Sequence, residues 1–229
     1  TTAYQFNNTE HAASLFGLKE FGNIYSRLGN PTVGALEARL TDLEEGAMCV
    51  ALSSGTSAVM YSLINIMSQG DNFVTANQLY GGTYTMFDNI LPEYGINSNK
   101  VDITDLKAVE DAIDDKTRAI YCETITNPGL VVADVTALSE IAHSKGIPLI
   151  VDATFTTSAI QKSFEFGADI IVYSLTKWMS GHGRVIAGAV IEKGGFDWGN
   201  GNFPLYDKPD TSYGGMRWGH DLGDLSSVA

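Results

Sequence analysis

The sequence predicts an α/β fold in which helices flank both faces of a mostly parallel sheet. Short runs rich in Val and Ile recur along the chain, as in residues 148–151 and 168–172, and helical apolar spacing separates most of them. Apolar residues make up 44% of the 229 residues, which is enough to build a substantial core. The length suits one large domain.

The first expected helix opens at Pro31 and Thr32, because proline is favoured in the first helical turn. Gly46 ends this helix, since glycine commonly follows the last helical residue. The apolar residues that recur at helical spacing between them are Val33, Leu36, Leu40 and Leu43.

Strands and helices alternate from that point on. The expected strands are residues 48–52, 72–76, 100–103, 118–123, 149–152, 170–174 and 187–191. The expected helices between them are residues 56–67, 83–91, 105–113 and 135–145, the last closed by Gly146. Because most connections contain a helix, most neighbouring strands should be parallel. The tight connection after Lys177 allows the last strand to pair antiparallel, and the sequence after Gly194 is typical of loops.

The charge of the chain excludes some classes of partner. There are 14 Lys and Arg against 27 Asp and Glu, a formal charge of −13, and the acids are spread along the chain. Such a surface repels nucleic acid and anionic membranes, although salt limits that repulsion to short range. No apolar stretch reaches the roughly 20 residues needed to cross a bilayer. We therefore expect neither a nucleic-acid partner nor a membrane partner.

Cys49 and Cys122 both lie in apolar, strand-like sequence, so we expect buried reduced thiols. No CxxC or His-rich spacing indicates a metal site. The N-terminus has no signal-peptide pattern. These features favour a location in the cytoplasm.

Two regions are expected along the chain. Residues 1–34 are polar, aromatic and rich in turn residues, and they are expected to form an extended arm outside the core. Residues 35–229 are expected to form the domain itself. The chain begins without methionine and neither end is typical of a domain boundary, so we expect it to belong to a longer protein.

Polar residues follow the predicted strands at the point where each strand ends. In open α/β sheets, ligands bind beyond the carboxyl ends of the strands, so these residues should converge on one edge. They are Ser53, Ser54, Gly55, Thr56, Tyr80, Glu123, Asn127, Asp152, Ser174, Thr176 and Lys177.

Lys177 and Asp152 are the most informative of these residues. Pyridoxal phosphate requires an amine that bonds to its aldehyde, an acid that keeps its ring nitrogen protonated, and hydroxyl groups for its phosphate. Lys177 supplies the amine, and Asp152 follows a neighbouring strand. The alternatives are that Lys177 is a solvated surface lysine and that Asp152 caps a helix.

A phosphate site is expected where residues 53–58 pass from a strand into a helix. Gly55 allows close approach of the backbone, and the N–H groups at a helix N-terminus attract anions. Ser and Thr also cap ordinary helices, so this signal is weak by itself. Ser174 and Thr176 can add hydroxyl donors to the same phosphate.

Arg27 and Tyr80 are further candidates. Arginine suits phosphate because its donors match the oxygens in pairs, although Arg27 alone also fits a surface charge. Tyr80 precedes Gly81 and Gly82, which leaves its ring free to stack on a flat cofactor or to pack as a half-buried core residue.

Two other motifs are rejected. Ser174-Leu175-Thr176-Lys177 fits the SxxK pattern of penicillin-recognising serine hydrolases, but the KTG and SDN elements of that chemistry do not occur. Gly181-His182-Gly183 fails the dinucleotide-binding fingerprint, because Ile186 stands where the third glycine belongs.

Taken together, the motifs resemble the Cys/Met-metabolism family of pyridoxal-phosphate enzymes, of fold type I. The resemblance runs from the first residue to about residue 220 and is greatest to the O-acetylhomoserine sulfhydrylases. The motifs that carry it, in family order, are Tyr25-Ser26-Arg27-Leu28-Gly29-Asn30-Pro31-Thr32, Ser54-Gly55-Thr56-Ser57-Ala58, Glu123-Thr124-Ile125-Thr126-Asn127-Pro128, Val151-Asp152-Ala153-Thr154 and Ser174-Leu175-Thr176-Lys177.

The resemblance implies a role for each matching residue. Lys177 would hold the cofactor covalently and later move protons, Asp152 would pair with the ring nitrogen, and Asn127 would lie near the ring hydroxyl. Tyr80 would stack on the ring and assist departure of the γ-substituent. The residues implied to hold the phosphate are Gly55, Thr56, Ser174 and Thr176, with Tyr25 and Arg27 reaching the phosphate of a neighbouring subunit.

The implied reaction is γ-replacement, in which O-acetylhomoserine and sulfide give homocysteine and acetate. The implied assembly is a homotetramer built from two dimers. The alternatives are a related γ-elimination or cystathionine-processing lyase and, in a different class, a non-catalytic fragment that serves in assembly or binding.

The chain departs from the family pattern at three points. Methionine γ-lyases carry cysteine where Gly82 stands, which weakens that alternative. Ala153 replaces a commoner asparagine, with no consequence that we can assign. The family's C-terminal small domain, with the arginine that binds the substrate carboxylate, is missing from this sequence, so the chain alone is expected to hold cofactor without necessarily turning over.

Overall fold

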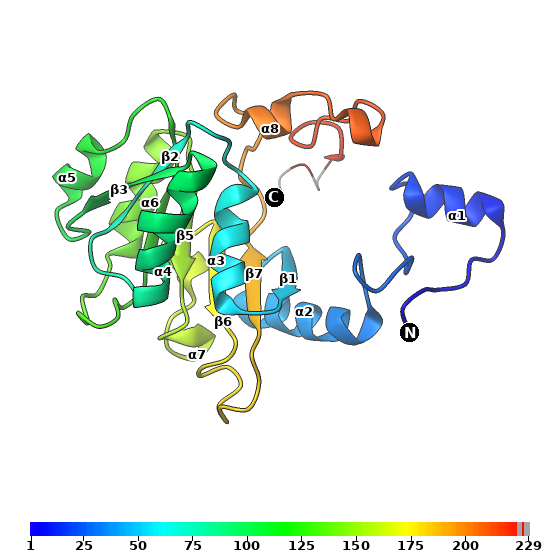
Figure 1. The fold of residues 1–229 in the computed structure, drawn as a ribbon, viewed down its shortest axis with the longest axis horizontal. Coiled ribbons are helices and arrows are strands. Elements are labelled where there is room, and N and C mark those ends of the chain that lie inside the picture. The colour runs from blue at the N-terminus through cyan, green and yellow to red at the C-terminus, as the bar shows by residue number, and fades with distance from the viewer. Residues whose placement is uncertain (224–225, 227–229) are drawn as a thin grey trace.

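The computed structural model describes residues 1–223 and 226, and within them seven strands form one sheet (Figure 1). The order across the sheet is β1-β7-β6-β5-β4-β2-β3. The strands are β1 (Met48–Leu52), β2 (Asn72–Ala76), β3 (Asn97–Val101), β4 (Thr117–Glu123), β5 (Leu149–Asp152), β6 (Ile170–Ser174) and β7 (Gly188–Glu192).

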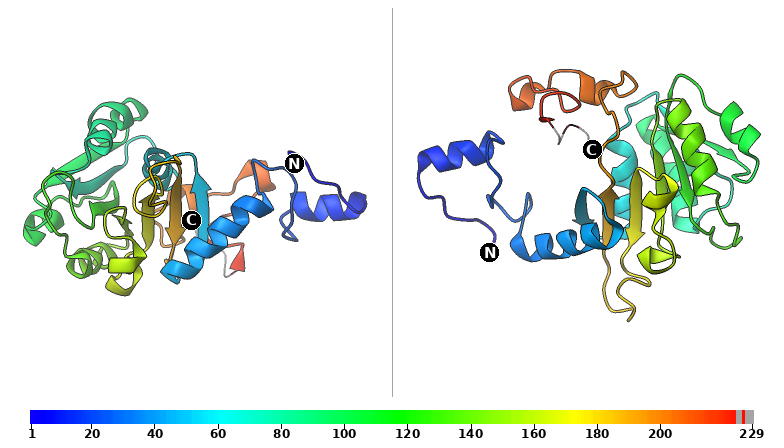
Figure 2. Two further views of the ribbon diagram at one scale, coloured as in Figure 1. Left: turned by 90° about the horizontal axis from the view of Figure 1, so that it is seen from below. Right: turned by 180° about the vertical axis from the view of Figure 1, so that it is seen from behind.

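Helices cover both faces of this sheet, which confirms the predicted α/β class (Figure 2). The helices are α1 (Thr9–Phe16), α2 (Pro31–Glu44), α3 (Gly55–Ile64), α4 (Gly81–Thr85), α5 (Leu106–Asp111), α6 (Val135–Ser144), α7 (Thr157–Ile160) and α8 (Pro204–Asp207). Helix α3 packs against β6 and β7, and α6 packs against β4 and β5.

Strands β3, β2, β4, β5 and β6 pair in parallel, as the intervening helices predict. Strand β7 runs antiparallel to both of its neighbours, β6 and β1, as the short connection after Lys177 allows. At its start, a Cβ on Gly188 would lie 2.0 Å from the carbonyl oxygen of Ser54, so only glycine fits there without movement.

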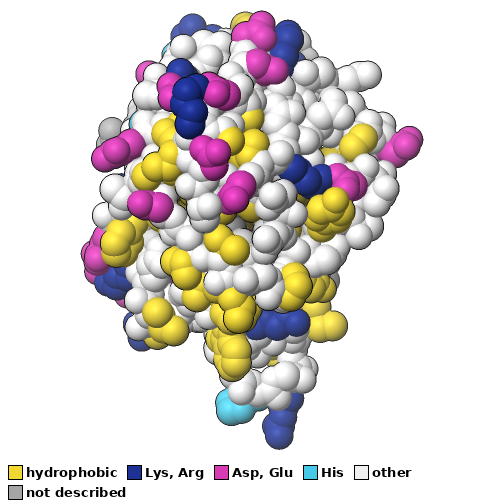
Figure 3. Space-filling model, turned by 90° about the vertical axis from the view of Figure 1, so that its left-hand side faces the viewer, with side chains coloured by type: hydrophobic (Ala, Val, Ile, Leu, Met, Phe, Trp, Pro, Cys, Tyr) yellow, Lys and Arg dark blue, Asp and Glu magenta, His cyan; other side chains and the backbone are white. Residues whose placement is uncertain are grey.

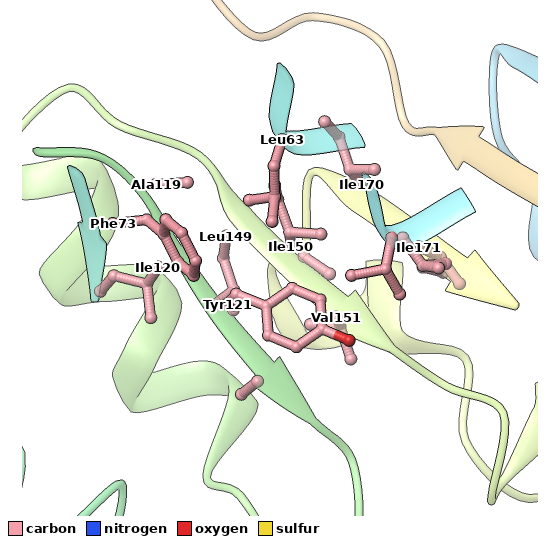
Figure 4. Close-up of a cluster of buried hydrophobic side chains, with 14 of the residues drawn as sticks. Leu63, Phe73, Ala119, Ile120, Tyr121, Leu149, Ile150, Val151, Ile170 and Ile171 are labelled. Atoms are coloured by element: carbon pink, nitrogen blue, oxygen red, sulfur yellow. The ribbon is translucent and has the colours of Figure 1, made fainter. Parts of the chain in front are cut away.

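The central strands are buried on both faces, which explains their continuous apolar sequences. Figure 4 shows part of the core, where side chains from neighbouring strands, including Tyr121, Ile150 and Ile171, lie together with Leu63 of α3. Each fully buried apolar side chain contributes about 1.5–3 kcal/mol relative to exposure. A rigid sheet of this kind fixes the positions of the residues that follow its strand ends.

The N-terminal region contains a helix that the sequence analysis did not predict. Asn8 caps α1, with its side-chain oxygen accepting from the His11 N–H at 2.8 Å. Helix α1 lies away from the sheet, and α2 extends from the sheet toward it (Figure 1). The predicted boundary between residues 34 and 35 falls inside α2, whose N-cap is Asn30.

The third strand was predicted at the wrong residues, since β3 covers Asn97–Val101 and not residues 100–103. Asn99 donates to Asn72 at 3.2 Å and to the Ala112 carbonyl at 3.0 Å, so polar side chains stabilise this edge strand. After Val101 the chain turns, with the Thr104 N–H donating to Asp102 at 3.0 Å. Ile103 therefore lies outside the strand.

The predicted helix over residues 83–91 is divided. Helix α4 ends at Thr85, a π-helical turn covers Met86–Ile90, and a 3-10 turn covers Leu91–Tyr94. Pro92 lies in that last turn, and Gly95 follows in a left-handed conformation with φ 76°. The two residues end the helical segment.

The region after Gly194 is more structured than its loop-like sequence indicates. Besides α8 it has a 3-10 turn at Thr211–Tyr213, and Trp198 and Phe203 are fully buried. The Trp198 indole donates to Glu192 at 2.8 Å, which ties this region to the end of β7. Further 3-10 structure at Ser163–Phe166 and helix α7 were also not predicted.

The surface agrees with the composition. Figure 3 shows acidic side chains spread over one side of the molecule, with Lys and Arg among them.

Among the described residues, no helix is long and apolar enough to span a membrane. The same residues contain no group of three or more His, Cys, Asp and Glu side chains placed to hold a metal ion. Cys49 and Cys122 are free and buried, as predicted.

Candidate functional site

A cavity of about 620 Å³ lies at the carboxyl ends of the central strands. It brings together most of the residues that the sequence analysis placed at this edge. The predicted site residues among its walls are Gly55, Thr56, Tyr80, Asn127, Asp152, Ser174, Thr176 and Lys177. Glu123, Thr154 and Trp178 also line it.

One wall of the cavity is formed where α3 begins beside the end of β6. The hydroxyl of Ser54 caps the helix by accepting from the Ser57 N–H at 3.0 Å. A Cβ on Gly55 would lie 2.5 Å from the Cβ of Ser174 and 2.7 Å from its Cα. Glycine is therefore required for the helix N-terminus and the Ser174 strand end to meet. The resulting arrangement of helix N–H groups and a hydroxyl suits a phosphate.

Asp152 ends β5 and is one of two acids that line the cavity, together with Glu123. Its carboxylate accepts from the Thr154 N–H at 3.0 Å and from the Tyr121 hydroxyl at 3.2 Å. Burial raises the pKa of Asp152, and these hydrogen bonds partly offset the rise. Within the described residues, no ion pair is found for this carboxylate, so a ligand that brings a positively charged N–H matches it.

Glu123 ends β4 in register with Asp152, and its two oxygens have separate partners. Oε1 accepts from the Tyr80 N–H at 2.7 Å, and Oε2 accepts from the Asn127 N–H at 2.9 Å. Burial, with a further contribution from nearby Asp152, raises the pKa of Glu123 to about 7 against the effect of the two N–H groups. Glu123 was predicted to lie at this edge, with no role assigned to it.

Lys177 lies in the turn after β6 and is exposed at the cavity. The Gly181 N–H donates to the Lys177 carbonyl at 3.1 Å, which holds the backbone of this turn. Thr176 bonds across the loop, donating its hydroxyl to the Ala187 carbonyl at 3.3 Å and accepting from the Ala187 N–H at 3.2 Å. Its single hydroxyl proton is thus directed at the backbone.

Thr154 is a residue that the sequence analysis missed. Its hydroxyl oxygen accepts from the Ser174 N–H at 2.8 Å, while its own N–H donates to Asp152. It therefore connects the acid of one strand end with the hydroxyl-bearing end of the next. Its place two residues after Asp152 in the motif was the only signal available.

Tyr80 precedes α4, and its side chain is 49% exposed beside the cavity. A Cβ on Gly82 would lie 2.7 Å from the Cε1 atom of the Tyr80 ring. A larger residue at that position would displace the Tyr80 ring. The position of this ring therefore explains why residue 82 is glycine.

Tyr25 and Arg27 are not brought to this cavity. The Arg27 guanidinium lies 4.9 Å above the centre of the Tyr25 ring, on the arm. Their predicted contact with the phosphate of a neighbouring subunit stays a prediction.

Comparison with known proteins identifies the family. The family model described as Cys/Met metabolism PLP-dependent enzyme matches residues 1–214, so the chain belongs to this pyridoxal-phosphate-dependent family. It is 45% identical over 223 residues to the O-acetyl-L-homoserine sulfhydrylase of Leptospira meyeri, which covers 97% of the chain and 50% of that protein. The chain thus spans about half the length of the curated relatives it matches.

Two solved structures illustrate the likeness of the fold. The putative O-acetylhomoserine (thiol)-lyase of Campylobacter jejuni superposes with a TM-score of 0.94 at 40% identity, covering 99% of this chain and 57% of that one. That protein contains N'-pyridoxyl-lysine-5'-monophosphate. The cystathionine gamma-lyase of Lactobacillus plantarum superposes with a TM-score of 0.76 at 35% identity, covering 84% of this chain and 48% of that one.

Proposed function

We propose that this chain is the cofactor-binding part of an enzyme that replaces the γ-acetoxy group of O-acetylhomoserine with sulfide. The products are homocysteine and acetate. The observation that carries the proposal is the convergence of Lys177, Asp152 and the α3 N-terminus on one cavity. Family membership supports the cofactor, and the similarity to O-acetylhomoserine sulfhydrylases supports the substrate.

The residues of the cavity fit pyridoxal phosphate. Asp152 is a buried acceptor that a pyridinium N–H would satisfy. Gly55, Thr56 and Ser174 would hold the phosphate, and Thr176 would support them through the Ala187 backbone. Tyr80 would cover the ring, with Asn127 near the ring hydroxyl. When bound, the cofactor acts as an electron sink for the substrate carbons.

The remaining chemistry belongs to the side chains of the protein. Lys177 would take the proton from the substrate Cα and move protons to and from Cβ, for which its place at the cavity suits it. Asp152, as a carboxylate, would hold a positive charge in place throughout the reaction.

Borohydride reduction tests the proposal. In the protein loaded with cofactor, peptide mapping should locate a pyridoxyl group on Lys177. The exposed Lys116 offers a matched control, since Lys116→Ala should keep the label and Lys177→Ala should lose it. Abundant bound cofactor with no label at Lys177 would contradict the proposal.

A related γ-elimination or cystathionine-processing activity is the second candidate, favoured by the similarity to a cystathionine gamma-lyase. Acetate release from O-acetylhomoserine with and without sulfide separates the candidates. Sulfide-dependent formation of homocysteine supports replacement, whereas α-keto acid released from methionine or cystathionine supports elimination.

We also propose that the enzyme is a cytoplasmic homotetramer of two dimers. The support for assembly is the arm, which carries exposed apolar side chains such as Phe21 (83% exposed) and Leu28 (68% exposed).

The support for the compartment is that both thiols are free and buried, with burial raising the pKa of Cys49 to about 12.

A further inference from the structure

Glu123 joins two segments that are distant in the sequence. It is only 5% exposed, and it lies at the end of β4, the strand between β2 and β5. One carboxylate oxygen accepts from the N–H of Tyr80, which follows β2, and the other accepts from the N–H of Asn127, four residues further along in the loop after β4. Both residues line the cavity.

A carboxylate is an unfavourable group to bury beside another acid. Asp152 lies directly opposite on β5, and no cation is paired with Glu123 among the described residues. The charge of Glu123 contributes to raising the pKa of Tyr121 and of Cys122 on its own strand. The other titratable or charged side chains that line the same cavity are Tyr80 and Lys177. The two N–H groups are what stabilises its charged form.

We propose that Glu123 is a positioning residue whose carboxylate fixes Tyr80 and Asn127 at the cavity. Both hydrogen bonds are to backbone N–H groups, so Glu123 acts on where these two residues lie, whatever their side chains do. The importance of that placement for the cofactor rests on the proposed function. The two hydrogen bonds do not depend on it, because they form within this chain without a bound cofactor.

Protonation of Glu123 removes part of this restraint. A neutral carboxylic acid directs an O–H outward from one oxygen, so it can no longer accept well from both N–H groups. Burial places this change close to neutral pH, since it raises the pKa of Glu123 to about 7. Above that pH both segments are held, and below it one of them is released.

Amide hydrogen exchange measured by NMR on the protein without cofactor tests the inference. Glu123→Gln keeps the shape but offers only one acceptor oxygen. We expect exchange at the Tyr80 or Asn127 amide to quicken by about tenfold or more, as for loss of a hydrogen bond to a charged group. The matched control is Glu140→Gln on the exposed side of α6, where both amides should keep their protection.

The wild-type protein gives a second measurement that needs no variant. Relative to the intrinsic exchange rate, protection of the two amides should fall as the pH drops from 8 to 6. In Glu123→Gln the same pH change should have no such effect. Glu123→Asp keeps the charge but has a shorter side chain, so it should restore the pH step while protecting only one amide.

Unchanged protection at both amides in Glu123→Gln, or a flat pH profile in the wild type, would overturn the inference. Faster exchange throughout β4 with a lower melting temperature would instead identify a merely structural role. Because none of these measurements requires cofactor, their failure is distinct from failure to label Lys177.

Discussion

At the scale of single residues, the site depends on two neighbouring acids with different surroundings. Asp152 has one N–H and one hydroxyl as partners, whereas Glu123 has two N–H groups. Burial raises the pKa of both. The backbone partners of Glu123 belong to two separate segments, so it organises the site. Asp152 lacks a second N–H partner and is the acid that a cationic ligand would satisfy.

Asp152→Asn should therefore weaken binding of pyridoxal phosphate. The variant keeps the size of the side chain but loses the negative charge that a pyridinium N–H requires. A hydrogen bond between charged groups contributes about 1.5–3 kcal/mol, so we expect affinity to fall by roughly 10- to 100-fold. Fluorescence titration of the cofactor-free protein measures this change. Asp115→Asn, at an exposed position, is the control, and equal affinities in the two variants would exclude the role of Asp152.

Glu123 should also make folding stability depend on pH. Its pKa is about 7 in the folded protein against 4.5 for the ordinary group, so the folded state binds more protons between these values. Stability should fall as the pH rises through this window, by about 3 kcal/mol at most for this group. Denaturant unfolding from pH 4.5 to 8 should show that Glu123→Gln gains on the wild type by that amount. Parallel curves for the two proteins would contradict the raised pKa.

The roles of Glu123 and Thr154 show where sequence reasoning stops at this scale. Lys177, Asp152 and Ser174 were predicted to lie at the cavity because they carry functional groups and follow predicted strands, and all three line it. Glu123 and Thr154 act mainly through the backbone N–H groups of Tyr80, Asn127 and Ser174. Every residue except proline has a backbone N–H group, so the sequence does not show which of these groups a given side chain will bind.

At the scale of elements, the contact between α3 and β6 builds the proposed phosphate site. Gly55→Ala should disturb it, because the new Cβ would lie 2.5 Å from the Cβ of Ser174. We expect a loss of about 1–3 kcal/mol in unfolding free energy, as for overpacked core positions, together with weaker cofactor binding. Denaturant unfolding and cofactor titration measure the two effects.

Gly34→Ala is the matched control for that variant. Gly34 lies in α2 with no atom near the position of an added Cβ, so alanine should stabilise the helix by up to about 1 kcal/mol. If Gly55→Ala also proved neutral or stabilising, the close approach of α3 to Ser174 would not constrain the site.

The strands that are buried on both faces were predicted at or within one residue of their observed bounds. Strands β4, β5 and β6 are buried on both faces and read as continuous apolar runs. Strand β3 lies at the edge and is held by asparagine side chains, so its polar sequence gave the wrong bounds. Helix α1 lies away from the sheet and was missed, because it is short and lies within residues 1–34, whose polar and turn-rich sequence indicates an extended arm.

At the scale of the whole molecule, the arm of residues 1–34 exposes apolar and charged side chains. Phe16 and Leu28 are exposed on it, and Arg27 has only the Tyr25 ring as a recorded partner among the described residues. The cavity, by contrast, lacks an arginine among its lining residues in the described part of the chain. A phosphate held in a protein of charge −13 needs local donors, and the arm of a second subunit would provide one.

Mixing two variants tests this arrangement. Arg27→Ala and Lys177→Ala should each bind cofactor poorly at limiting concentration. If the arm serves a neighbouring subunit, a mixed dimer has one site with both residues intact and one site with neither. Random reassembly of equal amounts should then restore about one quarter of the sites to wild-type affinity. If the arm instead served its own subunit, every site would keep one defect and mixing would restore none.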